Sequence, residues 1–164
     1  LKSSRIATWV TSGIGREEFH PQYAVRSTDT LYSLSKEGAG SAGPLVLALT
    51  AAVVEAAEEY AVTQPGGRLR VPMAGILDEA ANGCRWASLP DLYSHFGSRG
   101  INLVTILQSW SQGVDVWSQS GMRKLWSASN VKIYAGGVDE VDFLKQLSDN
   151  VGDFRYEQRT VSRG

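Results

Sequence analysis

Two adjacent acidic residues follow an apolar run near the middle of the sequence. Residues 74–77 read Ala-Gly-Ile-Leu, and Asp78 and Glu79 come next. Two carboxylates at a strand tip are costly to desolvate unless a cation or hydrogen-bond donors compensate, and Mg²⁺ carrying phosphates is suited to that. In phosphoryl transfer to water, Asp78 would hold the hydrated metal while Glu79 orients or deprotonates the attacking water. A solvated acidic turn explains the pair alone equally well.

Two polar residues flank the next apolar run, residues 101–107. Gln108 follows the run and Arg99 precedes it. A strand-tip glutamine can donate to a phosphate oxygen and accept from water, so Gln108 is a candidate sensor of a γ-phosphate. Arg99 would lie one strand length away, at the opposite edge of the sheet. Its functional interpretation is therefore an arginine finger donated to a neighbouring subunit, and its spacing alone slightly favours an ordinary solvated arginine.

A glycine-rich segment, residues 38–43, reads G-x-G-x-x-G between an expected strand and an expected helix. In a dinucleotide-binding fold, an acidic residue about 20 positions later would bind a ribose hydroxyl. The next expected strand instead ends at Asp78, about 35 positions beyond Gly43. The segment is therefore better explained as a flexible turn, although its amides could still contact phosphate because they precede a helix.

The elements that would position these residues alternate in type. We expect strands at residues 30–35, 68–77, 101–107 and 131–135, and helices at residues 44–62, 88–97, 110–127 (broken at Gly113 and Gly121) and 139–150. This order is typical of an α/β domain with a mostly parallel sheet and helices on both faces. Ligands of such sheets bind beyond the carboxyl ends of the strands, where Asp78, Glu79 and Gln108 would meet.

The composition is that of one well-packed globular domain. The 164 residues carry 16 Lys and Arg against 17 Asp and Glu, and 43% are hydrophobic, which excludes collagen-like, disordered and disulfide-scaffold chains. Net charge −1 gives no overall basic character, so a nucleic acid would need a local patch or an assembly. The longest apolar stretch, residues 45–54, is shorter than the ~20 residues of a membrane helix.

Other residue types that often carry chemistry give weak signals. Cys84, the single cysteine, cannot form an internal disulfide and suits the reducing cytoplasm, and it follows no nucleophile-elbow pattern. His20 and His95 are isolated, so no metal cluster is expected. Four tryptophans are better explained as core or interface anchors than as base-stacking platforms, namely Trp86, Trp110, Trp117 and Trp126.

Four motifs together resemble a known family. In order and spacing, residues 75–82 (GILDEAAN), 88–92 (SLPDL), 97–101 (GSRGI) and 106–112 (ILQSWSQ) are similar to the type IV coupling proteins of bacterial conjugation, the TraG/TraD-like DNA-translocating ATPases. Residues 130–134 and the acidic pair at 139–140 resemble the next strand and helix of that family. The resemblance covers roughly residues 30–150.

The resemblance implies a RecA-like three-layer αβα fold with a mostly parallel sheet. Residues 1–28 would be an irregular segment, 29–152 the C-terminal part of the P-loop NTPase domain, and 153–164 an edge strand or tail. Asp78 and Glu79 would be the Walker B acids, with Asp78 binding Mg²⁺ through water. Gln108 would be the sensor that contacts ATP, and Arg99 would act between subunits.

The same resemblance implies partners and a location. The family forms a membrane-anchored homo-hexamer that moves single-stranded DNA and its relaxase to a type IV secretion channel, and it carries a TraM recognition domain. The chain would be a cytoplasmic part of a bacterial inner-membrane protein. It contains no G-x-x-x-x-G-K-[ST] phosphate loop and no membrane helix, so it would be an incomplete RecA-like unit lacking the Walker A strand.

We expect the phosphate loop and the anchor upstream of Leu1, and negligible ATP hydrolysis by this chain alone. The full-length protein would be the ATPase. The alternative is a non-catalytic docking module for secretion or relaxosome partners.

Overall fold

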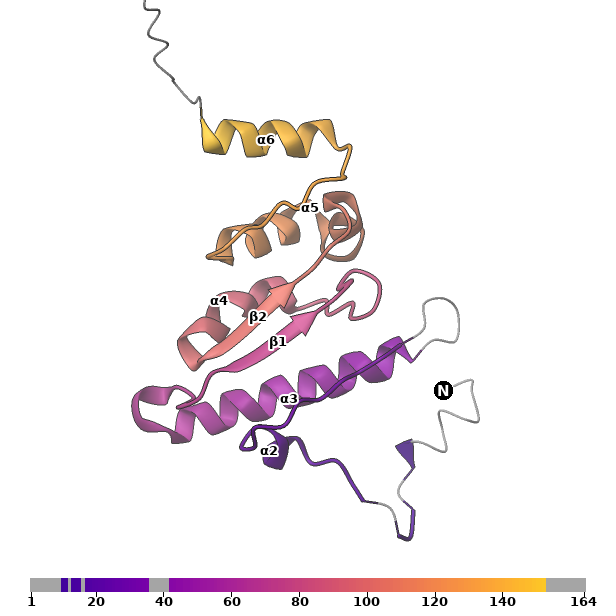
Figure 1. Ribbon diagram of the computed structural model, residues 1–164, viewed down its shortest axis with the longest axis vertical. Helices are drawn as coiled ribbons and strands as arrows, with labels where there is room; N and C mark the ends of the chain where they lie inside the picture. Colours follow the sequence, from indigo (N-terminus) through magenta and orange to yellow (C-terminus); the bar gives the residue numbers. More distant parts are fainter. Residues whose placement is uncertain (1–9, 12, 16, 36–41, 153–164) are drawn as a thin grey trace, which may run out of the picture. The chain divides into compact units, whose positions relative to one another are not determined.

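The computed structural model describes residues 10–11, 13–15, 17–35 and 42–152. The chain divides into two compact units, one ending at Tyr134 and the other beginning at Ala135. The first unit contains α2 (Pro21–Ala24), α3 (Gly43–Thr63), the short 3₁₀ helix η1 (Pro65–Gly67), β1 (Met73–Leu77), α4 (Leu89–Arg99), β2 (Ile101–Thr105) and α5 (Trp110–Ala128) (Figure 1). The second unit contains α6 (Val141–Val151).

β1 and β2 form a two-stranded parallel sheet, joined by α4. The register places Met73 opposite Ile101 and Leu77 opposite Thr105. The ladder continues beyond both strands, because the Ile106 amide donates to the Leu77 carbonyl and the Ala80 amide donates to the Ile106 carbonyl, each at 3.0 Å. The two strands therefore deliver their following residues to the same edge of the sheet.

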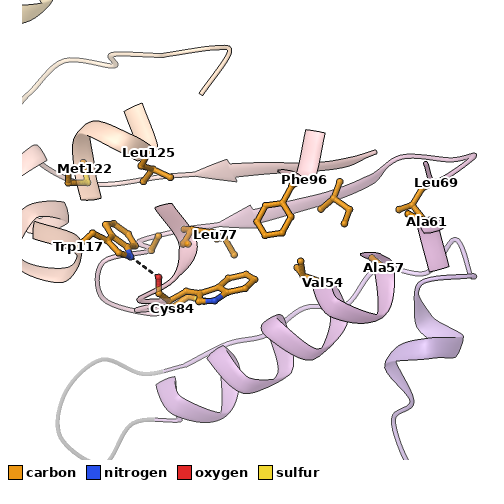
Figure 2. Packing of buried hydrophobic residues seen from close by; sticks show 14 residues of the cluster. Val54, Ala57, Ala61, Leu69, Leu77, Cys84, Phe96, Trp117, Met122 and Leu125 are labelled. Carbon is orange, nitrogen blue, oxygen red and sulfur yellow. Dashed lines mark hydrogen bonds between the residues drawn. The ribbon is translucent and has the colours of Figure 1, made fainter. Parts of the chain in front are cut away.

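One face of this sheet packs with α3, α4 and α5 into a hydrophobic core (Figure 2). The Trp117 indole donates to the Trp86 carbonyl at 2.7 Å within it. Its buried residues include Val54, Ala57 and Ala61 of α3, Leu77 of β1, Leu89 and Phe96 of α4, Ile101 of β2, and Trp117, Met122 and Leu125 of α5. The core accounts for Trp86 and Trp117 as anchors, as their sequence context predicts.

The opposite face of the sheet is exposed and largely apolar. Residues 74, 76, 102, 104 and 106 alternate with the buried ones, and the Ile76 side chain is 69% exposed. Helices therefore cover one face in the described residues, whereas the sequence pattern predicts helices on both. The structure confirms a mixed α/β arrangement with parallel strands, on a smaller scale than expected.

Two predicted strands do not form, and two are shorter than predicted. Residues 30–35 and 131–135 are described and irregular, and Leu34 and Ile133 are 91% and 86% exposed. An alternating apolar pattern selects a face, but a strand also needs a neighbouring strand to receive its hydrogen bonds, and the described residues offer none to these segments. The predicted strand 68–77 begins only at Met73, after Pro72, which has no amide to donate.

Three predicted helices match closely. α3 begins one residue before the predicted Pro44, and α4 runs two residues past the predicted end, to Arg99, where Gly100 adopts a left-handed conformation. α6 begins at Val141, since Asp139 lies two residues before it and does not cap it. The described residues contain no helix with the length and apolarity needed to cross a membrane.

α5 is interrupted at Ser118, and both of its halves are visible in Figure 1. Ser118 has φ 63°, and its hydroxyl accepts from the Gly121 amide at 3.3 Å, so it caps the second half. The predicted breaks at Gly113 and Gly121 are wrong. These glycines instead allow close packing, because a Cβ at Gly113 would lie 2.4 Å from the sulfur of Met122.

Candidate functional site

The turn after β1 holds Glu79 in an unusual backbone conformation. Glu79 has φ 47°, in the left-handed region that non-glycine residues rarely adopt. Three hydrogen bonds fix this turn: the Asn82 and Gly83 amides both donate to the Glu79 carbonyl at 2.8 Å, and the Ala80 amide donates to β2's extension. Such conformations cost on the order of 1–3 kcal/mol and cluster at functional sites. The strain therefore marks Glu79 as a candidate functional residue.

The side chain of Glu79 is bound by the glutamine that follows β2. Gln108 Nε2 donates to Glu79 Oε1 at 2.5 Å. The two residues are 29 positions apart and meet because their strands are parallel neighbours in register. Hydrogen bonds to a charged acceptor are shorter and stronger than neutral ones. The structure thus brings together two of the residues predicted to share the strand tips.

A second glutamine supports the first. Gln112 Nε2 donates to Gln108 Oε1 at 3.3 Å, which fixes the orientation of the Gln108 amide. Gln112 lies in the first turn of α5, where its own amide donates to Ser109 Oγ at 3.2 Å. The sequence places Gln112 in a family motif without showing any role for it. The available signal was its i+4 spacing from Gln108 at the start of a helix.

Asp78 occupies a different environment from its neighbour. Asp78 comes directly after β1 and continues the row of exposed residues 74 and 76, whereas Glu79 is half-buried. No three side chains of His, Cys, Asp or Glu gather as a metal site within the described ranges. Mg²⁺ usually keeps several waters and is bound through one or two carboxylates plus substrate phosphates. A water-mediated contact from one exposed carboxylate therefore fits this donor set.

Arg99 lies at the other end of the sheet. It is the last residue of α4 and directly precedes the glycine before β2, so it stands where the strands begin. Its Nη1 donates to the Gly67 carbonyl at 3.1 Å, in the turn after α3. The structure does not bring Arg99 together with Glu79 and Gln108 within one chain.

The remaining candidates do not assemble into a site. Burial raises the pKa of the Cys84 thiol, and a hydrogen bond with the Thr50 side chain acts in the opposite direction. Cys84 is thus a core residue rather than an activated nucleophile. His20 and His95 are exposed. Of the glycine-rich segment, residues 38–41 lie outside the described residues, and Gly43 begins α3.

Comparison with known families decides the relationship. Residues 72–164, more than half of the chain, match the family described as the TraM recognition site of TraD and TraG. The chain belongs to this family. The match confirms the resemblance to TraG/TraD proteins, and it includes β1, β2, Glu79 and Gln108. No curated protein and no solved structure matched the chain.

Proposed function

We propose that the chain is part of a conjugative type IV secretion coupling protein, an ATP-driven translocase that moves single-stranded DNA and its relaxase to the secretion channel. The hydrogen bond between Glu79 and Gln108 at the tips of two parallel strands carries this proposal. Membership of a TraG/TraD family supports it. The proposed complete fold is RecA-like, because parallel sheets are usually covered on both faces and this one has an exposed apolar face.

In this function, the two acids have separate tasks. Exposed Asp78 would hold hydrated Mg²⁺ through water. When bound, the metal would neutralise charge on the β- and γ-phosphates. Glu79 would accept a proton from, or orient, the attacking water. Its carboxylate is held by the hydrogen bond from Gln108. The phosphate loop would come from another segment, since the sequence contains none.

Gln108 would couple the nucleotide to Glu79. An amide nitrogen carries two N–H groups, so Gln108 Nε2 can donate to a phosphate oxygen while it keeps its bond to Glu79. Its oxygen already accepts from Gln112, so the amide cannot turn over without losing that bond as well. Movement of the γ-phosphate would therefore be transmitted to the position of the Glu79 carboxylate.

The first experiment replaces Glu79 by Gln in the full-length coupling protein. We expect nucleotide binding to persist and hydrolysis to fall by about 10²–10⁴-fold, the usual contribution of general acid–base catalysis. Glu59→Gln, at an exposed position of α3, removes the same charge and is the matched control. This variant should hydrolyse ATP at the wild-type rate. Unchanged turnover in Glu79→Gln would refute the assignment of the base.

The second experiment uses the 164-residue chain alone. Without a phosphate loop it should hydrolyse ATP negligibly, even with Mg²⁺, because no described group holds the β-phosphate. Robust Mg²⁺-dependent turnover by the purified chain would contradict the proposal that the phosphate loop comes from another segment. The proposal includes a homo-hexameric assembly anchored in the bacterial inner membrane, with this part on the cytoplasmic side.

Recognition of a relaxosome component is a second candidate function. The matched family is described by TraM recognition, and its range includes α6. Within its own unit, α6 exposes apolar side chains at both ends, with Val141 72% and Val151 86% exposed. Pull-down of TraM by the chain, with and without nucleotide, would separate this docking role from the motor role. Nucleotide-independent capture that Val141→Ser abolishes would favour docking.

A further inference from the structure

Two arginines connect the turn after α3 with the last turn of α4. Arg68 Nη1 donates to the Gly97 carbonyl at 2.9 Å, while Arg99 Nη1 donates to the Gly67 carbonyl at 3.1 Å. Between them, the Leu69 amide donates to the Arg99 carbonyl at 2.9 Å. We call Arg68 and Arg99 the arginine clasp. Each guanidinium is thus anchored to backbone about 30 positions away in the sequence.

Two glycines make room for the clasp. Gly67 has φ +65°, and a Cβ there would lie 3.0 Å from Arg99 Nη1. Gly100 has φ +79°, and a Cβ there would lie 3.1 Å from Arg68 Cγ. Both positions require left-handed backbone as well as space, and glycine provides both. The local backbone is therefore shaped around the two arginine side chains.

A third arginine adds to the positive charge at this end of the sheet. Arg68 and Arg70, both exposed, line an open hollow of about 500 Å³ together with Gln64, Pro65 and Leu69. Within the described ranges, none of the three arginines forms an ion pair with a carboxylate. Because Arg68 and Arg70 line the same hollow, an anion bound there would be attracted by both charges.

We propose that Arg68 and Arg70 bind a phosphate oxyanion, with Arg99 as a positioning residue that holds the turn beneath them. The planar guanidinium fork matches phosphate geometry, and only one N–H of Arg68 is committed to Gly97. The phosphate is presented either by the backbone of single-stranded nucleic acid or by a free nucleotide. The site is separate from Glu79, because the two lie at opposite ends of the strands.

The nucleic-acid source rests on the proposed function, whereas the oxyanion site does not. This distinction determines the design of the test. Glu79→Gln removes the proposed base at the far end of the strands and should leave binding at the arginines unchanged. Failure of the motor proposal would therefore appear in hydrolysis, and failure of the oxyanion proposal in binding.

The test measures fluorescence anisotropy of a labelled single-stranded oligonucleotide with the 164-residue chain over a range of salt concentrations. The Arg68→Gln/Arg70→Gln variant should lower the log–log slope of affinity against salt by about 1.4, since each phosphate contact on a single strand contributes ~0.7. Arg85→Gln/Arg123→Gln changes charge equally at exposed positions elsewhere and should retain the slope. Circular dichroism of each variant checks that it folds.

Competition distinguishes the two sources. Displacement of the oligonucleotide by equimolar ATP, without Mg²⁺, would assign the site to a free nucleotide, and displacement only at large excess would assign it to nucleic acid. Arg68→Lys/Arg70→Lys should largely restore the slope, because lysine keeps the charge without the planar fork. The proposal is overturned if the slope of log affinity against log salt concentration changes equally in the Arg68→Gln/Arg70→Gln variant and in its control. It is also overturned if the chain binds neither oligonucleotide nor ATP.

Discussion

The hydrogen bond between Glu79 and Gln108 should be measurable as an energetic coupling in the chain itself. Glu79→Ala and Gln108→Ala, alone and together, form a double-mutant cycle that isolates the pairwise energy from the separate effects of each change. Any effect of Glu79→Ala on the backbone strain is the same with and without Gln108, so it cancels from the coupling energy. The bond is 2.5 Å long with a carboxylate acceptor, which favours a strong interaction, but both groups contact solvent.

These features set the expected magnitude. Hydrogen bonds to charged groups contribute ~1.5–3 kcal/mol, and neutral ones about 0.5–1.5 kcal/mol. Because solvent competes at this exposed position, we expect a coupling of about 1 kcal/mol, below the range for charged groups and within the range for neutral ones. Gln112→Ala should lower this coupling, since loss of the bond to Gln108 frees the Gln108 amide to rotate.

Urea unfolding followed by tryptophan fluorescence is a suitable assay. All five tryptophans precede residue 135, so they belong to the first compact unit, which contains Glu79 and Gln108. The control cycle pairs Glu79→Ala with Gln119→Ala, an exposed glutamine in the second half of α5, and should give additive changes. A Glu79–Gln108 coupling within about 0.3 kcal/mol of this control would refute the reasoning.

Three further predictions concern the support of the site. Trp117→Phe leaves the buried Trp86 carbonyl without its donor and should lower the free energy of unfolding by about 1–3 kcal/mol in urea titrations; a change below about 0.5 kcal/mol would show that this bond contributes little. Because burial raises the pKa of the Cys84 thiol, the folded state keeps its proton longer than the unfolded state. The resulting stability is complete below the ordinary thiol pKa and is lost as the pH rises through the raised one, so the melting temperature should fall at alkaline pH in wild type more than in Cys84→Ala. Gly66→Ala and Gly67→Ala both place alanine at positive φ and should each cost about 1–2 kcal/mol, but only Gly67→Ala contacts the clasp and should weaken oligonucleotide binding. Equal binding by the two variants would contradict the positioning role.

The sequence predicts the strand tips well because continuous apolar runs that end in polar residues mark parallel strands. β1 and β2 form where such runs occur, and Gln108 meets Glu79 as a result. Segments 30–35 and 131–135 are different, because an apolar segment forms a strand only where a neighbouring strand receives its hydrogen bonds. Local spacing does not reveal such a neighbour.

The side-chain network around the site was less accessible to prediction. The contacts of Arg68 with Gly97 and of Gln108 with Glu79 join residues about 29 positions apart, and their geometry follows from the register of the sheet. The break at Ser118 also escapes a glycine-based reading, since it arises from a serine that caps a new helix. The glycines of α5 instead serve packing.

The connection β1–α4–β2 has a consequence for the order in which the chain acquires structure. These elements occupy residues 73–105 without interruption by any other segment, so one continuous stretch of chain contains the whole unit. We expect this βαβ unit to form early, during synthesis, before α5 has fully emerged. During that interval, the apolar side chains that α5 will cover are in contact with water, in addition to those of Ile76 and Val104, which stay exposed in the folded unit. Early folding of this unit thus coincides with its greatest exposure to misassembly, and a chaperone that binds extended apolar segments would act there first.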